Sequence, residues 1–280
     1  MKDNNLTEID INYNLIFSTD IEPQFYDSKN QELIYYWTDK KRVYWKERII
    51  KNADIESFIV YNRLFAKDKN RCYLQGTSIQ NSNPKKFTSL NNCYAKDENY
   101  VWTTGGIIKN IDSETFEVCD DGIQKPISII KKEFKDNSFK TVKLKIPYGY
   151  AKDKDNVYYE NYQGKTKVLK KANSETFRSL NNGYYGLDNS FVFYGQNIIQ
   201  KANPKTWKLI DFENNKWFSK DEKSVFYTNK IIKGADVETF ELYKAKGKGG
   251  YVEYFGKDKN NFYNNTETID LSEIELLVNE

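Results

Sequence analysis

The chain has 280 residues, 16% of them aromatic, and its 43 Lys and Arg against 40 Asp and Glu leave a net charge of +3. It contains no His, which excludes the commonest general base, the usual Ser and Cys catalytic triads and most zinc sites. Its 22 Tyr and 17 Phe favour strands, so the composition predicts a folded β-rich protein rather than a disordered one.

At the N-terminus, residues 1–36 contain alternating apolar side chains and predict cap strands. This segment lacks the apolar stretch of a signal peptide, and no run in the chain reaches the roughly 18 apolar residues of a membrane span. As given, the chain is expected in the cytoplasm, and the cell envelope stays open if a leader was removed. Cys72, Cys93 and Cys119 have no CxxC spacing and fit reduced, buried thiols.

From Trp37 onwards one sequence unit recurs about six and a half times. Each unit opens with an aromatic residue and an Asp, continues into a short aromatic strand, and closes with Asp or Asn followed four positions later by an aromatic residue. The opening residues are Asp39, Asp68, Asp97, Asp153, Asp188, Asp221 and Asp258. The closing residues are Asp54, Asn83, Asp112, Asn173, Asn203 and Asp236. The interval between them is 15 residues in five complete units and 20 in the fourth, a regularity that chance does not produce.

Both recurrent polar positions have a predicted structural role. The opening Asp stands where a strand ends, so its carboxylate is expected to accept hydrogen bonds from N–H groups of the following turn. The closing residue has the form of an N-cap, with Pro84 and Pro204 at the first position of a single helical turn. Calcium binding is the alternative, but only Asp153 and Asp155 form a D-x-D pair and these turns lack Gly. We therefore expect no metal and no cofactor.

An aromatic residue also recurs at the middle of the strand that follows each opening turn. These residues are Tyr44, Tyr73, Trp102, Tyr158, Phe193, Phe226 and Tyr263. Since neighbouring side chains on a strand point in opposite directions, the rings are expected to face one way and to form a ladder from repeat to repeat. Core packing is the favoured interpretation of the ladder, and a row of rings that stack on a ligand is the alternative.

The spacing of the units divides the chain into five parts. These are N-terminal cap strands (1–36), repeats one to three (37–119), an inserted basic hairpin (120–149), repeats four to seven (150–267) and a C-terminal cap, strand or short helix (268–280). Residues 127–130 and 139–146 alternate in polarity and predict the two strands of the inserted hairpin. Insertions into repeat arrays often carry binding. The candidate partner-binding residues are Lys131, Lys132, Lys135, Phe139 and Lys143.

The predicted fold class is all-β, with tandem β-hairpin repeats in an open or curved stack. Successive opening Asp residues outside the insertion are 29 to 37 positions apart. Propeller blades need about 40 residues or more, so several units are short for a blade. A propeller-like ring remains the alternative.

Two strings carry a family resemblance: YAKDKDNVYY from Tyr150 and FGKDKNNFY from Phe255. They resemble the bacterial DKNYY repeat family, which is named for that string, and the resemblance extends from about residue 37 to 264 apart from the insertion. It implies a β-rich repeat fold and brings no catalytic residues. Many members look exported or lipid-anchored, and this chain departs from them by showing no leader.

Three hypotheses for the function follow from these features. A non-catalytic protein-binding module, an antagonist or immunity-type protein that neutralises a bacterial toxin or effector, fits a repeat surface rich in Tyr and Trp. A carbohydrate- or cell-surface-binding protein of the envelope is the alternative. An enzyme is not expected, because each conspicuous acid recurs in every unit whereas a catalytic carboxylate pair occurs once. Nucleic-acid binding is not expected either, because the charges are interspersed and Lys far outnumbers Arg. The sequence assigns no oligomeric state.

Overall fold

The protein is described from a computed structural model. The structure describes residues 26–27, 32–33, 36–38, 41–46, 48–61, 64–90, 93–120, 123–124, 131–135, 138–142, 149–160, 166–180, 184–213, 215–246, 252–270, 272 and 275–276. Over these residues it consists of antiparallel strands and turns with one short 3-10 helix, η1 (Ile55–Ser57). The predicted all-β class is confirmed.

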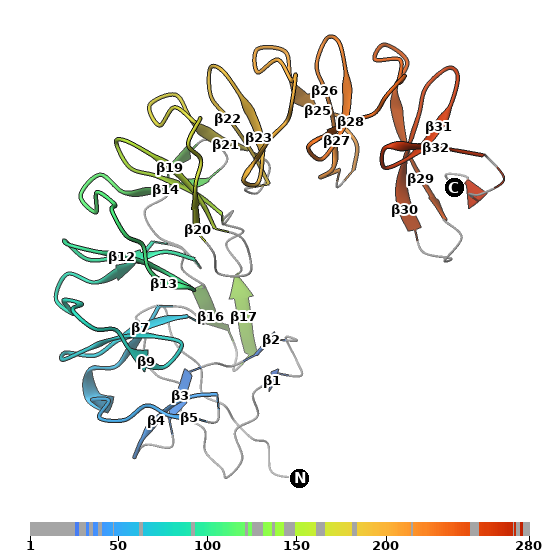
Figure 1. Cartoon of the computed structure of the whole chain (residues 1–280). Coiled ribbons are helices and arrows are strands. Elements are labelled where there is room, and N and C mark those ends of the chain that lie inside the picture. Colours follow the sequence, from blue (N-terminus) through green and yellow to red (C-terminus); the bar gives the residue numbers. More distant parts are fainter. Residues whose placement is uncertain are drawn as a thin grey trace, which may run out of the picture.

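Seven small sheets follow one another along the chain and form an open arc (Figure 1). The first three contain β3 (Tyr36–Thr38), β4 (Val43–Trp45) and β5 (Arg48–Ile49); β6 (Ile59–Val60), β7 (Phe65–Lys67), β8 (Cys72–Leu74) and β9 (Thr77–Ser78); and β10 (Thr88–Ser89), β11 (Ala95–Lys96), β12 (Val101–Thr103) and β13 (Gly106–Ile107). The predicted open, curved stack is confirmed, since the described strands do not close into a ring.

The remaining four sheets continue the same pattern, and two of them carry a fifth strand. They contain β15 (Ile123–Gln124), β14 (Glu117–Asp120), β18 (Tyr150–Lys152), β19 (Val157–Glu160) and β20 (Thr166–Val168); β21 (Arg178–Leu180), β22 (Tyr185–Leu187), β23 (Val192–Tyr194) and β24 (Asn197–Ile198); β25 (Lys208–Leu209), β26 (Phe218–Lys220), β27 (Val225–Tyr227) and β28 (Lys230–Ile231); and β32 (Glu267–Ile269), β31 (Phe262–Asn264), β30 (Val252–Lys257), β29 (Glu241–Lys246) and β33 (Glu275–Leu276).

Each sheet combines parts of two sequence units. Its first strand comes directly after the closing aromatic residue of one unit, as β6 follows Phe58, and this strand pairs with the opening strand of the next unit, β7. The first sheet has only three strands among the described residues, because no described unit precedes it. The last half-unit completes its sheet because β29 is the strand that follows Phe240 at the end of the sixth unit.

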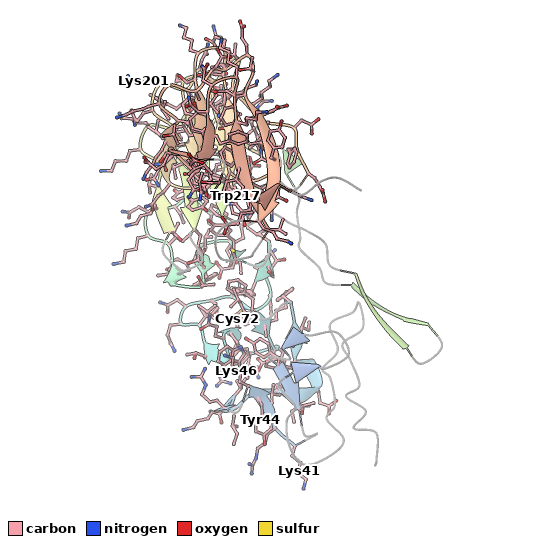
Figure 2. The ribbon with its side chains drawn as sticks, turned by 90° about the vertical axis from the view of Figure 1, so that its right-hand side faces the viewer. Lys41, Tyr44, Lys46, Cys72, Lys201 and Trp217 are labelled. Carbon is pink, nitrogen blue, oxygen red and sulfur yellow. The ribbon has the colours of Figure 1, made fainter. Side chains whose placement is uncertain are left out.

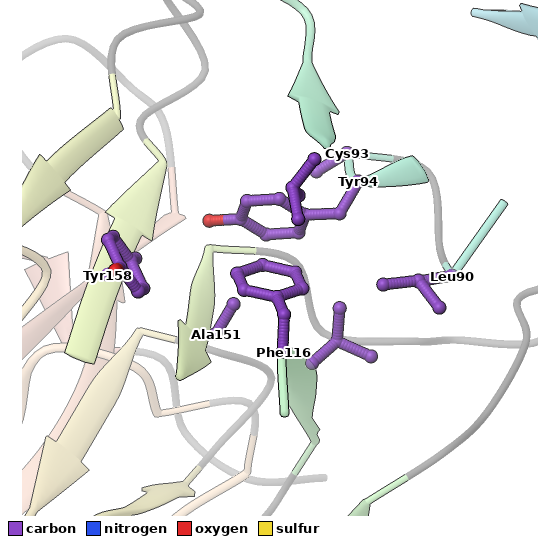
Figure 3. Packing of buried hydrophobic residues seen from close by; sticks show 8 residues of the cluster. Leu90, Cys93, Tyr94, Phe116, Ala151 and Tyr158 are labelled. Carbon is purple, nitrogen blue, oxygen red and sulfur yellow. The ribbon is translucent and has the colours of Figure 1, made fainter. Parts of the chain in front are cut away.

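The core consists of six layers of apolar side chains, one between each pair of neighbouring sheets. In the layer between the third and fourth sheets, the ring centroid of Phe116 lies 5.4 Å from that of Tyr94 and 5.9 Å from that of Tyr158 (Figure 3). The other closing rings occupy the same place in their layers: Phe58, Phe87, Phe177, Trp207 and Phe240. The three cysteines are free and buried in these layers.

The aromatic residues in the middle of the strands belong to this core. Six of the seven are at most 2% exposed, and only Tyr44, in the first sheet, is half-buried. The Val that precedes several of these rings is buried as well, on the opposite side of the sheet, because every inner sheet is covered on both faces. These rings therefore hold neighbouring sheets together and do not form an exposed row for a ligand.

A small residue stands opposite six of these rings in the neighbouring strand, whereas Trp37 stands opposite Tyr44. The positions are Ala66, Ala95, Ala151, Gly186, Ser219 and Gly256. At Gly186 the reason is direct, because an added Cβ would lie 2.3 Å from Cζ of Phe177. The closing ring of the preceding unit thus lies against the backbone at this position.

We predict that Gly186→Ala destabilises the protein by about 1–3 kcal/mol, because the buried ring of Phe177 has to move to make room for the methyl group. Urea unfolding followed by Trp fluorescence measures the loss. In a Phe177→Leu background the same substitution should cost less, because Leu is shorter than Phe. An equal loss of stability from Gly186→Ala in the two backgrounds would contradict the close approach of the Phe177 ring to the backbone at this position.

The insertion lies inside the fourth sheet rather than between two sheets. It connects β14 to β18, and these two strands pair with each other through Glu117↔Lys152 and Val118↔Ala151. Within it, β16 (Lys131–Lys135) and β17 (Ser138–Val142) form a hairpin with Phe134 opposite Phe139. Figure 2 shows this hairpin projecting away from the stack. The hairpin was predicted with its first strand over residues 127–130, which lie outside the described residues, and the strand observed starts at Lys131.

The chain termini add strands at both ends. Within residues 1–36, β1 (Tyr26–Asp27) pairs with β2 (Glu32–Leu33), and the rest of the predicted cap lies mostly outside the described residues. At the C-terminus, β33 pairs with β29 through Ala245↔Leu276. Between them Asp270 accepts a hydrogen bond from the N–H of Ser272, as the closing residues do in complete units. Asp270 follows Asp258 by 12 residues, and in the sequence Ile274 stands four positions later, where the complete units have an aromatic residue.

Candidate interaction surface

The opening aspartates join successive units. Six of the seven lie among the described residues and are at most 4% exposed, whereas Asp39 lies outside them. In the fifth unit, one oxygen of Asp188 accepts the N–H groups of Ser190 and Phe191, both at 2.7 Å, and the other accepts the N–H of Asn173, the closing residue of the preceding unit, at 2.8 Å. The same three bonds are formed by Asp68, Asp97, Asp153, Asp221 and Asp258.

In three units the carboxylate also accepts a phenol hydroxyl from the next strand. The donors are Tyr73, Tyr158 and Tyr263, at 2.6, 2.6 and 2.8 Å. Both oxygens of these aspartates are thus engaged within the protein. Over the described part of the chain, no group of three or more Cys, Asp or Glu side chains is placed to hold a metal ion.

The closing residues cap the turn that follows them. Asp54 is the N-cap of η1 and accepts the N–H of Ser57 at 3.1 Å. The side-chain oxygens of the other five accept an N–H group two or three positions on: Asn83, Asp112, Asn173, Asn203 and Asp236. These side chains therefore close each unit by local hydrogen bonds, as polar residues at helix N-termini do.

At five of the six joints the closing residue pairs with the residue that follows the next opening Asp, and the exception is Asn173, whose next opening residue, Asp188, is followed by Asn189. The Asp–Lys ion pairs are Asp54 with Lys69, Asp112 with Lys154 and Asp236 with Lys259. The Asn–Glu hydrogen bonds are Asn83 with Glu98 and Asn203 with Glu222. The ammonium group of Lys259 and the hydroxyl of Thr239 lower the pKa of Asp236 to about 2. Neighbouring units are thus matched in charge along the outer side of the stack.

The Lys that precedes several opening aspartates is also used inside the stack. Lys67 donates to the carbonyl oxygens of Pro84 and Phe87 at 3.0 and 3.1 Å, and Lys96, Lys152 and Lys220 bind the equivalent turns. Burial lowers the pKa of Lys67 and of Lys96. The K-D dipeptide of the repeat therefore serves internal contacts through both of its side chains.

The candidate partner-binding residues of the insertion are placed only by their backbone. Lys131, Lys132 and Lys135 belong to β16, Phe139 belongs to β17, and Lys143 lies outside the described residues.

A different set of side chains is available at the opposite end of the sheets from the aspartate turns. We call it the inner aromatic patch: Tyr184, Tyr194, Phe212, Trp217, Tyr227 and Tyr254. Figure 2 shows Trp217 well below Lys201, on the inner side of the arc in Figure 1. The ring centroid of Tyr254 lies 5.4 Å from that of Trp217 and 5.9 Å from that of Phe212. Among the described residues, the hydroxyls of Tyr184, Tyr194, Tyr227 and Tyr254 have no hydrogen-bond partner, so they can bind an external group.

The patch is part-exposed and bordered by charges of both signs. Tyr184 is 37% exposed, and the ammonium group of Lys216 lies 5.8 Å from the centre of its ring. Burial raises the pKa of Tyr194, and the phenols of Tyr184 and Tyr227 raise it further. Lys244, which stands opposite Tyr254 in the register of β29 and β30, forms an ion pair with Glu213. Rings with an apolar face and a free polar tip are typical anchors of protein interfaces.

The sequence interpretation did not single out this patch. Tyr194 and Tyr227 follow buried rings within the strings V-F-Y, and their residue type does not separate them from the core. The signal was their position at the third residue of the central strand, where Trp45, Leu74, Thr103 and Tyr159 stand in other units.

Comparison with known proteins gives a family and nothing more specific. The sequence profile of the DKNYY family matches in three overlapping segments, over residues 2–77, 65–230 and 218–277. No curated protein and no solved structure matches the chain. No helix among the described residues is long and apolar enough to cross a membrane. Because the matched segments together cover nearly all of the sequence, the chain belongs to the DKNYY family.

Proposed function

We propose that the chain is a non-catalytic protein-binding repeat module that antagonises a bacterial toxin or effector, and that it binds its partner through the inner aromatic patch. The conspicuous acids support a non-catalytic role, because they are occupied by hydrogen bonds that recur from unit to unit. The patch carries the second part: it gathers half-buried Tyr and Trp rings from three consecutive sheets, with free hydroxyls and mixed charges at its border.

Tyr184 is the ring through which we test the patch. The immobilised chain is expected to retain a discrete protein from a lysate of its source bacterium, and Tyr184→Ala should weaken the affinity of the purified pair at least about 10-fold. Ile107→Ala is the matched control, because Ile107 is 47% exposed but lies in the third sheet, away from the patch. It should leave the affinity unchanged. Equal losses in both variants would exclude the patch as the contact surface.

The antagonist role needs its own measurement. The retained protein, expressed alone, should inhibit bacterial growth, and co-expression of the wild-type chain but not of Tyr184→Ala should restore it. If the retained protein does not inhibit growth, the chain would still be a protein-binding module, but the antagonist role would be contradicted. Binding to glycans with no protein partner would contradict both and favour an envelope carbohydrate-binding protein.

A further inference from the structure

One buried acid takes no part in the recurrent pattern. Glu160 stands at the end of β19 and is 2% exposed. Its Oε1 accepts the N–H of Thr104 at 3.3 Å and also the hydroxyl of Thr104, which belongs to the β12–β13 turn of the preceding sheet. Its Oε2 is buried without a hydrogen-bond partner. Glu160 therefore joins the third and fourth sheets through one oxygen and leaves the other unsatisfied.

The longer hairpin of the fourth unit explains why an acid is buried here. In other units the equivalent residue begins a tight turn with a positive φ, as Gln75 (51°) and Thr228 (53°) do. In the fourth unit Glu160 instead continues the strand opposite Thr166, whose hydroxyl oxygen is also buried without a partner. Two unsatisfied polar atoms at one joint are costly when the carboxylate is ionised.

No described cation offsets that charge. A neighbouring titratable group is the phenol of Tyr94, which donates to the carbonyl of Gly149 at 2.7 Å and whose pKa burial raises well above its ordinary value. Burial likewise raises the pKa of the Cys119 thiol on β14 to about 12. The lysines on the packed strands are Lys96 and Lys152, which bind carbonyl groups of the closing turns, and Lys167, which is exposed. None of the described Lys or Arg side chains forms an ion pair with Glu160.

We propose that Glu160 is a proton-operated latch at this joint: with its proton the carboxyl holds the third and fourth sheets together, and without it the joint loosens. Burial, opposed by the hydrogen bonds from Thr104, raises the pKa of this carboxyl from 4.5 to about 7. Below pH 4.5 the group is protonated in the folded and the unfolded chain, and its contribution to stability is fully present. As the pH rises towards 7 the unfolded chain ionises first, so the folded state loses stability, and above pH 7 the loss levels off.

The composition isolates this titration. Because the chain contains no His, the only other side chains with an ordinary pKa close to this range are the three Cys, which ionise mainly above pH 8. The difference between 4.5 and about 7 corresponds to an increase of roughly 100-fold in the unfolding equilibrium constant between pH 5 and 8.

The test is urea unfolding of the full chain from pH 5 to 8, with hydrogen exchange at Thr104 as the local readout. The wild type should lose stability across this range by the factor above, and the Thr104 amide should lose protection beyond the intrinsic effect of pH. Glu160→Gln, which cannot ionise, should show neither change. A wild type with constant stability, or an equal slope in Glu160→Gln, would overturn the latch.

A second variant keeps the test decisive if Glu160→Gln folds poorly. Thr104→Val removes a hydroxyl that stabilises the ionised carboxylate, so the midpoint of the pH transition should move upwards. An unchanged midpoint would show that the titrating group lies elsewhere and would overturn the assignment to Glu160. A purely structural role of Thr104 would lower stability at all pH values without moving the midpoint.

Discussion

Replacement of Asp188 by Asn is expected to destabilise the protein by about 3–5 kcal/mol. Its carboxylate is 1% exposed and accepts three backbone N–H groups, two from its own turn and one from Asn173 in the preceding unit. The amide of Asn keeps one acceptor oxygen and replaces the other with an NH2 group. Whichever way the amide is turned, that NH2 group faces a backbone N–H donor, and a buried donor is left without an acceptor.

Asp155→Asn is the matched control for Asp188→Asn. Asp155 also lies in an opening turn, but its side chain is exposed and accepts no hydrogen bond among the described residues, so its substitution should cost less than about 0.5 kcal/mol. Urea unfolding measures both variants. In Asp188→Asn, hydrogen exchange should accelerate at Asn173 as well as at Ser190 and Phe191, because the carboxylate joins two units. Acceleration confined to the turn would contradict the joining role.

The parts of this fold that follow from sequence are those enforced locally in every unit. A turn that needs its N–H groups satisfied selects Asp at one position, and a short turn that needs a cap selects Asp or Asn at another, so both recur at a fixed interval. The second oxygen of Asp188 reaches back across 15 residues to Asn173, and no local pattern indicates that contact. The same limit applies to the sheets, each of which is shared between two sequence units.

The candidate surface could not be predicted from residue type. Whether an aromatic ring is exposed depends on its position at the edge or in the middle of a core layer, and the type of side chain does not reveal that position. Phe193 is buried between sheets, whereas its neighbour Tyr194 reaches the inner side of the arc with a free hydroxyl. Glu160 depends on another non-local feature, the length of the hairpin that follows it, which keeps the residue in strand conformation. The inserted hairpin is conspicuous in the sequence because it interrupts the repeat pattern. The residues of the inner aromatic patch belong to the repeats and are therefore not conspicuous.

The matched pairs along the outer side suggest how the units keep their order. A closing Asp meets a Lys, as Asp112 meets Lys154, and a closing Asn meets a Glu, as Asn203 meets Glu222. Exposed pairs of this kind add little stability, but a shifted stack would place Asp against Glu and lose hydrogen bonds at several joints at once. The repeated cores are nearly interchangeable, so these side chains give each joint a preference for its own neighbour.

Removal of one closing ring is the second large perturbation. Phe177→Ala is expected to cost about 3–5 kcal/mol, because the ring is 4% exposed and fills the layer between the fourth and fifth sheets, with its centroid 5.2 Å from that of Tyr150 and 5.9 Å from that of Phe193. The cavity cannot collapse easily, since the spacing of the two sheets is also fixed by the hydrogen bond from the N–H of Asn173 to Asp188.

Phe191→Ala is the matched control for Phe177→Ala. Phe191 borders the same layer, but it is half-buried, so its loss should cost about 1–2 kcal/mol. In a stack where each sheet contacts only its neighbours, one weakened layer should divide the urea transition of Phe177→Ala into two steps, with sheets one to four and five to seven unfolding separately. A single cooperative transition with a loss no larger than that of Phe191→Ala would show that the closing ring is not the main contact between sheets.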